Sequence, residues 1–154
     1  MKVFDIMSEH IVTVGLGEPV AAAARLLKQY NIGAVPVCDE RGNLRGMITD
    51  RDIAVRCVAN GLSPMETKTG DVMTRGVITI NDNAYIGDAA RLMADAQIRR
   101  LPVCRDGRLV ACCRWPILRE TPTATRKLRK LYVKFLKTSA ECSIYHSHCA
   151  QILL

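Results

Sequence analysis

Short apolar runs and amphipathic stretches alternate along the first 110 residues. Ile11–Val14 and Val77–Ile80 are rich in β-branched residues, which predicts two strands. Each run is followed by apolar residues at helical spacing, so an amphipathic helix is expected after each strand. Pro19 suits the first helical position of the first helix, and Asn81 or Asp82 can cap the second. The predicted buried stripes are Val20, Ala23, Ala24 and Leu27 in the first helix, and Ile86, Ala89, Ala90 and Met93 in the second.

A hairpin is predicted after the first helix. Ala34–Val37 and Leu44–Thr49 are its two strands, joined by the polar turn over residues 39–43. Asp50 is then expected to cap a second helix over Arg51–Asn60, which Gly61 ends. The predicted order is therefore strand–helix–strand–strand–helix within about 60 residues, a size that buries little apolar surface when alone.

This pattern occurs twice. Asp5-Ile6-Met7-Ser8 matches Asp71-Val72-Met73-Thr74, and Pro36-Val37-Cys38 matches Pro102-Val103-Cys104 at the same offset. We expect the two copies to pack together in one α/β fold. The boundaries that follow are a first repeat over 1–62, a linker over 63–70, a second repeat over 71–118 that is incomplete at its end, and a tail over 119–154.

Charge and cysteine usage separate the end of the chain from its body. Residues 111–154 hold eight of the 22 lysines and arginines but two of the 15 acidic residues, so most of the net charge of +7 is there. They also hold four of the seven cysteines and two of the three histidines. The body is nearly neutral, and nucleic acid is not an expected partner for it. The odd number of scattered cysteines indicates reduced thiols rather than a disulfide framework.

The candidate binding residues lie where the second strand of the hairpin meets the following helix. In Thr49-x-x-Asp52 the carboxylate can accept both hydroxyls of a ribose, and the threonine hydroxyl adds a contact on the same turn. The helix N-terminus favours an anionic group such as a phosphate, which Arg51 can also reach. The same Thr-x-x-Asp pattern is an ordinary helix cap, so a purely structural role stays open at this point.

The repeat order, the D-[IV]-M-[ST] opening, the Pro-Val strands and Gly46–Ile53 together resemble CBS domains, the adenosine-ligand-sensing modules named after cystathionine β-synthase. The resemblance covers residues 1 to about 110. It implies two β-α-β-β-α repeats packed with pseudo-two-fold symmetry, and one adenosyl ligand such as AMP, ADP or ATP, with no covalent cofactor. The site residues that it implies are Met47, Thr49, Arg51, Asp52, Ile78, Thr79, Arg99, Leu101 and Pro102.

Other features bear on activity, partners and location. The body contains no nucleophile–base pair, metal-ligand cluster or glycine-rich phosphate loop, so we expect a regulatory protein rather than an enzyme. No apolar run of about 18 residues indicates a membrane span, and Asp5 and Glu9 interrupt any secretory signal. The expected location is therefore the cytoplasm, and the resemblance implies a homodimer that signals to an effector protein.

The second repeat departs from the first at its end. Ile117 occupies the position that matches Asp52, and Pro116 stands where a helix should start, so a second site would lack its carboxylate. A back-translation of Val110–Arg119 with chosen codons, read in a shifted frame, gives Gly-Leu-Leu-Ser-Leu-Ala-Asp-Leu-Ala-Arg, a sequence like that of residues 46 onward. We therefore hypothesise that the chain from about residue 111 is translated out of frame.

The tail supports two further interpretations. Residues 126–137 have the pattern of a basic amphipathic helix, which is typical of membrane-surface or nucleic-acid binding. Cys142, His146, His148 and Cys149 have a spacing that fits no usual closed zinc site. A peripheral membrane or nucleic-acid-binding protein, or a non-functional frameshifted product, are therefore the alternatives to a nucleotide sensor.

Overall fold

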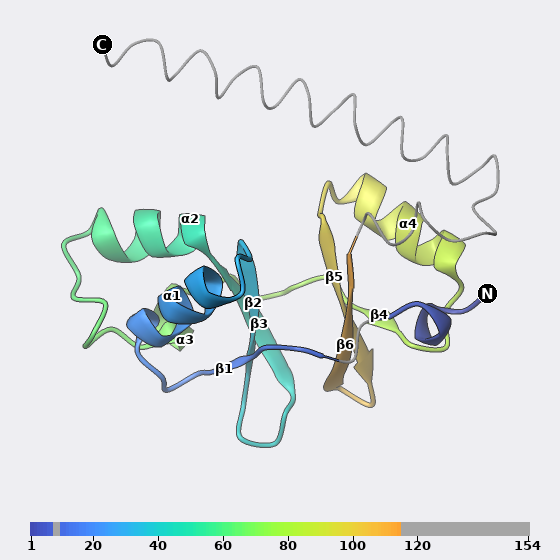
Figure 1. Ribbon diagram of the computed structural model, residues 1–154, viewed down its shortest axis with the longest axis horizontal. Coiled ribbons are helices and arrows are strands. Elements are labelled where there is room, and N and C mark those ends of the chain that lie inside the picture. Colours follow the sequence, from blue (N-terminus) through green and yellow to red (C-terminus); the bar gives the residue numbers. More distant parts are fainter. Residues whose placement is uncertain (8–9, 115–154) are drawn as a thin grey trace, which may run out of the picture. The chain divides into compact units, whose positions relative to one another are not determined.

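The computed structural model describes residues 1–7 and 10–114, and these form a mixed α/β fold with two three-stranded sheets (Figure 1). This is the predicted fold class. The elements in chain order are η1 Val3–Asp5, β1 Val14–Gly15, α1 Val20–Gln29, β2 Ala34–Cys38, β3 Leu44–Thr49, α2 Asp50–Asp52, η2 Ile53–Val58, α3 Thr69–Val72, β4 Ile80–Asn81, α4 Ile86–Asp95, β5 Arg100–Arg105 and β6 Arg108–Arg114.

The internal repeat is visible in the positions of these elements. The helices α1 and α4 each have 10 residues and begin at matching positions, Val20 and Ile86. One sheet has the order β1-β2-β3 and the other has the order β4-β5-β6. The hairpin turns match as well, because Gly42 and Gly107 both have positive φ angles, of 80° and 81°. Such angles are readily adopted by glycine, which has no Cβ, and both turns depend on that freedom.

The first sheet is built on β2. This strand pairs in parallel with β1 and antiparallel with β3, with Val35 opposite Ile48. The helix α1 lies beside β2 (Figure 1) and contacts β2, α3 and η2. It buries the predicted residues Val20, Ala23 and Leu27, whereas Ala24, also predicted to be buried, is only partly buried. One hydrophobic core joins this helix face to the sheet, with its buried members being Val14, Val20, Ala23, Leu27, Val35, Val37, Ile48, Cys57, Val72 and Met73.

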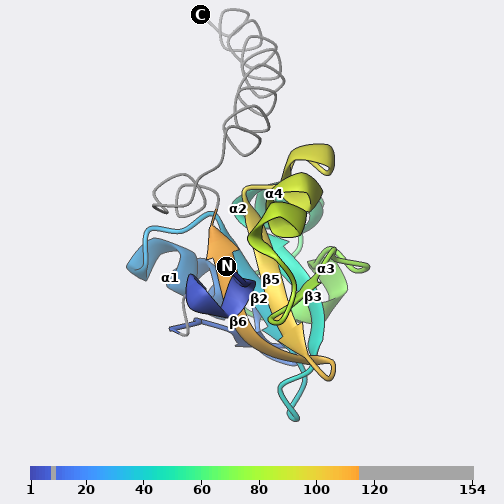
Figure 2. The ribbon, with the colours of Figure 1, turned by 90° about the vertical axis from the view of Figure 1, so that its right-hand side faces the viewer.

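Contacts divide the described residues into two compact units. The larger unit contains residues 10–79 and 102–111, and the smaller unit contains residues 1–7, 80–101 and 112–114. In the smaller unit the N-terminal turn is tied to the segment that leads into α4 (Figure 2). The backbone NH groups of Val3 and Phe4 donate to the carbonyl oxygens of Ala84 and Asp82, at 2.9 and 3.0 Å. The α4 stripe is buried as predicted, at Ile86, Ala89, Ala90 and Met93.

Several predicted element boundaries are wrong. The strands expected over residues 11–14 and 77–80 are two-residue strands that begin at Val14 and Ile80. Pro19 is the N-cap of α1 with an extended backbone, not its first helical residue. Neither Asn81 nor Asp82 caps α4, whose N-cap is Tyr85. Asp82 is buried and so does not stand at the exposed helix end.

The second helix of the first repeat also differs from the prediction. Its cap is Thr49 rather than Asp50, because the hydroxyl of Thr49 reaches the NH group of Asp52 three residues later. From Ile53 to Val58 the helix continues as a π-helix. The backbone NH of Ala59 accordingly donates to the carbonyl of Ala54, five residues earlier. Such π segments are rare, and they occur frequently at functional sites.

Candidate ligand-binding site

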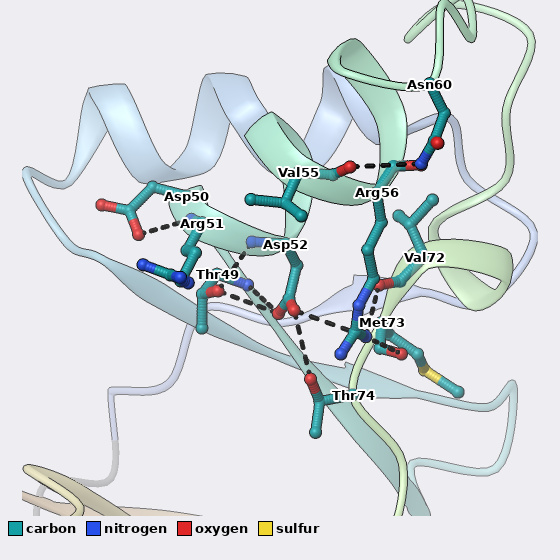
Figure 3. A network of polar contacts seen from close by, with 10 residues as sticks. All are labelled: Thr49, Asp50, Arg51, Asp52, Val55, Arg56, Asn60, Val72, Met73 and Thr74. Atoms are coloured by element: carbon teal, nitrogen blue, oxygen red, sulfur yellow. Dashed lines mark hydrogen bonds and ion pairs between the residues drawn. The ribbon is translucent and has the colours of Figure 1, made fainter.

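Thr49 and Asp52 form a reciprocal capping box at the end of β3 (Figure 3). Thr49 Oγ1 accepts a hydrogen bond from the backbone NH of Asp52 at 3.0 Å. Asp52 Oδ2 in turn accepts from the backbone NH of Thr49 at 3.0 Å and from Thr49 Oγ1 at 2.8 Å. The cap interpretation left open by the sequence is therefore correct for the geometry of this turn.

The other oxygen of Asp52 is held by two residues outside the capping box. Thr74 Oγ1 donates to Asp52 Oδ1 at 3.2 Å, and Arg56 Nη1 lies 3.4 Å from the same oxygen (Figure 3). Only about a tenth of the Asp52 side chain is exposed (10%). The carboxylate is thus nearly buried, and its three hydrogen bonds and one ion pair provide the polar partners that a buried carboxylate requires.

Arg56 ties the candidate site to the start of the second repeat. Its Nη1 atom also donates to the carbonyl oxygens of Val72 and Met73, at 3.0 and 2.9 Å. Next to these carbonyls, Thr74 pairs with β3 in an antiparallel bridge, where Met47 NH donates to Thr74 O at 3.0 Å and Thr74 NH donates to Met47 O at 2.8 Å. The segment Val72–Thr74 is therefore fixed to β3 and to the helix that follows it.

Gly46 permits this close approach. A Cβ atom at position 46 would lie 2.5 Å from the carbonyl oxygen of Thr74 and 2.7 Å from Met73 Sδ. Both distances are shorter than side chains tolerate, so the contact depends on glycine. Gly46 belongs to the motif that supported the family resemblance, and here it has a definite packing role beside the candidate site.

The structure places the predicted site residues in different surroundings. Thr49 and Asp52 are joined directly, and Met47 is buried on β3. Arg51 is exposed on α2, and Ile78 and Thr79 are exposed just before β4. Leu101 and Pro102 are buried on β5, and Arg99 is exposed next to it. The binding role of all nine predicted residues stays a prediction, and Arg99 and Leu101 belong to the smaller unit while the others belong to the larger one.

Two residues that contact the candidate carboxylate were missed by the sequence analysis. Arg56 stands four residues after Asp52, the spacing at which opposite charges meet on a helix, so this ion pair could have been anticipated. Thr74 was recognised only as part of the repeated D-V-M-T motif. Its contact with Asp52 spans 22 residues of sequence, and no local pattern predicts such a contact.

The family model of the CBS domain matches residues 3–58 and 70–111. The chain belongs to the CBS-domain family. Its relatives include the CBS domain-containing protein YhcV of Bacillus subtilis, which is 44% identical over 71% of this chain and 76% of YhcV. Hypoxic response protein 1 of Mycobacterium tuberculosis is 34% identical over 90% of this chain and 92% of that protein.

Two solved CBS structures were obtained with adenosyl ligands. The CBS domain pair of protein MJ0100, in complex with 5′-methylthioadenosine and S-adenosyl-L-methionine, is 30% identical and has a TM-score of 0.66, covering 77% of this chain and 93% of that one. CBSX2 in complex with AMP is 26% identical and has a TM-score of 0.67, covering 76% and 92%. The resemblance inferred from the repeats is therefore confirmed for family and fold.

Further predictions concerned the end of the second repeat, the tail, membrane spans and metal sites. The second CBS match ends at residue 111, where the sequence of the second repeat departs from that of the first. Ile117, Pro116, the basic segment 126–137 and the four tail residues Cys142, His146, His148 and Cys149 lie outside the described residues. Within residues 1–7 and 10–114, no helix is long and apolar enough to cross a membrane. In the same ranges no three His, Cys, Asp or Glu residues gather as a metal site.

Proposed function

We propose that this CBS-domain regulatory protein binds an adenosyl ligand, such as AMP, ADP or ATP, with Asp52 as the ribose-binding group. The observation that carries the proposal is the position of the Asp52 carboxylate. It is held at the junction of β3 and α2 by a helix cap, and its Oδ1 atom accepts a hydrogen bond from the hydroxyl of the exposed residue Thr74. A fixed, nearly buried carboxylate beside an exposed hydroxyl suits recognition of a vicinal diol.

The family supports this choice of ligand class. MJ0100 was solved with two adenosyl compounds and CBSX2 with AMP, and both share the fold of this chain over about three quarters of its length. In the proposed site Met47 lies under the adenosine and Arg51 meets a phosphate. Ile78, Thr79, Leu101 and Pro102 surround the base, and Arg99 adds a second positive charge.

The proposed output is a change in protein association. CBS pairs regulate rather than catalyse, so a ligand signal needs a protein that receives it. We propose that the protein acts in the cytoplasm as a homodimer and contacts an effector protein. A second, equivalent site is not proposed, because Ile117 cannot accept a hydrogen bond from a ribose.

A thermal-shift panel with AMP, ADP, ATP, NAD and S-adenosylmethionine tests the proposal. A ligand present at about a hundred times its Kd should stabilise the protein by roughly 2.7 kcal/mol. In the Asp52→Asn variant, which keeps the side-chain shape, this shift should disappear. Asp50→Asn is the matched control, because Asp50 is exposed and its side chain accepts a local hydrogen bond from the NH of Arg51.

The outcomes separate the candidate functions. A shift with one adenosyl ligand that is lost in Asp52→Asn and kept in Asp50→Asn supports the sensor. No shift with any ligand, in a chain that unfolds cooperatively, contradicts it. An equal shift in both variants would place the ligand away from Asp52 and contradict the assignment of the site.

A further inference from the structure

Most of the hydrogen-bonding capacity of the Asp52 carboxylate is already taken by three hydrogen bonds. A carboxylate offers about four lone-pair sites. Oδ2 accepts two hydrogen bonds from Thr49, at 3.0 and 2.8 Å, while Oδ1 accepts from Thr74 at 3.2 Å and lies 3.4 Å from Arg56. A ribose diol brings two further donors, one more than the remaining capacity, so both hydroxyls can bind only if at least one present hydrogen bond breaks.

The contact that can break most readily is the one from Thr74. The two bonds from Thr49 belong to the helix cap, and Arg56 is held by its own bonds to the carbonyls of Val72 and Met73. The Thr74 bond is the longest hydrogen bond to the carboxylate. Its side chain is on an exposed residue, so it can rotate away without opening the core.

We infer that Thr74 sets the affinity of the site by competing with the ligand's ribose hydroxyls for Asp52 Oδ1. This inference rests on the proposed function. Thr74 is attached to this part of the fold in two ways, by its backbone bridge to Met47 on β3 and by its side-chain bond to Asp52. Ligand binding removes the side-chain attachment of the segment that leads from α3 towards β4. Occupancy of the site is thereby coupled to the attachment of residues 72–74.

The test uses the full chain and isothermal titration with AMP. Thr74→Val keeps the side-chain shape but removes the hydroxyl, so AMP should bind about three- to tenfold more tightly, the scale of one ordinary net hydrogen bond. Thr74→Ser keeps the hydroxyl and should bind like the wild type. With 2′,3′-dideoxy-AMP, which has no ribose hydroxyls, Thr74→Val should give no gain in affinity.

Amide hydrogen exchange supplies an independent readout. If AMP displaces the Thr74 hydroxyl, the backbone NH of Thr74 should exchange several-fold faster in the complex than in the free wild type. In Thr74→Val the exchange rate at position 74 should not change with AMP, because there is no hydroxyl to displace. A residue that merely supports the fold would not show this dependence on both the ligand and the hydroxyl.

Two results would overturn the inference, and they are distinguishable. Weaker or unchanged AMP binding by Thr74→Val, with binding still lost in Asp52→Asn, would refute competition while leaving the proposed function intact. No binding by either the wild type or Thr74→Val, with AMP or with any other ligand of the thermal-shift panel, would refute both. AMP binding by Thr74→Val but not by the wild type would support competition, because the Thr74 hydroxyl would then prevent binding entirely.

Discussion

The backbone carbonyl of Thr74 stands 2.5 Å from the point where a Cβ atom would be attached to Gly46. Two antiparallel hydrogen bonds between Met47 and Thr74 fix this approach, so the carbonyl cannot withdraw without losing them. The close contact joins β3 of the first repeat to the D-V-M-T segment that opens the second. The absence of a side chain at position 46 is therefore a condition for the geometry around Asp52.

Gly46→Ala should destabilise the protein by about 2–3 kcal/mol, since the new methyl group collides with backbone rather than with a movable side chain. Urea unfolding followed by circular dichroism measures this. Gly87→Ala in α4 is the control, because a Cβ there has no atom within 4 Å. That change should be neutral or stabilise by about 0.5–1 kcal/mol. Equal stability of the two variants would contradict the assigned role of Gly46.

The repeat and its buried faces could be predicted from the sequence because they depend on local periodicity. The stripe beginning at Ile86 is buried as expected, and the stripe beginning at Val20 is buried except at Ala24, since apolar residues at helical spacing determine which face is covered. The pairing of Thr49 with Asp52 was also within reach, because both partners lie on one turn.

What the sequence could not supply is the surroundings of the carboxylate. The contact from Thr74 and the bonds from Arg56 to Val72 and Met73 link segments that are 16 to 22 positions apart. Their meeting depends on how α3 packs against β3, which is a tertiary result. The predicted strand boundaries were wrong for a similar reason, since strand pairing is also a tertiary result. Ile11 and Val77 are apolar, but pairing with a neighbouring strand begins only at Val14 and Ile80.

The helix cap gives a second prediction. Thr49→Val removes the hydroxyl that accepts from Asp52 NH and donates to Asp52 Oδ2, while it keeps the side-chain volume. Loss of the cap should lower the free energy of unfolding by about 1–2 kcal/mol. Thr49→Ser, which retains the hydroxyl, should lie within about 0.5 kcal/mol of the wild type. Equilibrium unfolding of both variants measures these changes. A similar loss of unfolding free energy in both would indicate that Thr49 stabilises the protein by packing rather than by capping.

Buried thiols give a third prediction. Burial raises the pKa of Cys38 to about 11, with a smaller effect of the neighbouring Asp39 carboxylate, and burial also raises the pKa of Cys113 to about 11. Both thiols should stay protonated at pH 8, so iodoacetamide should label them slowly in the folded protein and rapidly in urea. Peptide mass spectrometry resolves the two sites, and rapid native labelling of either would contradict this assignment.

The same shifts set the direction of a pH effect on stability. A thiol whose pKa is raised by folding contributes fully below its unfolded pKa of about 8.5, and this contribution is lost as the pH rises towards 11. Replacing Cys38 with alanine should therefore flatten the fall in urea midpoint between pH 8.5 and 10.5. A fall as steep as that of the wild type would show that other groups cause it.

The hairpin turn provides a test at acid pH. The side-chain amide of Asn43 donates to Asp39 Oδ2 at 3.0 Å, and the backbone NH groups of Asn43 and Arg41 each donate to Oδ1 at 2.9 Å. Arg45 adds an ion pair at 2.8 Å. These donors, with the Asn43 side chain contributing most, hold the pKa of Asp39 well below its usual range. The ionised carboxylate is thus the form that fits the turn.

Because the pKa of Asp39 is lowered by folding, its contribution to stability is complete above the unfolded pKa of about 4 and declines as the pH falls below it. Asp39→Asn, which cannot ionise, should be less stable than the wild type at pH 7, and the difference should shrink between pH 5 and 2. Glu40→Gln serves as the control, since Glu40 is the exposed neighbour of Asp39 in the same turn. Urea midpoints across this range measure the effect, and a constant difference between Asp39→Asn and wild type would mean that the turn does not depend on the charge of Asp39.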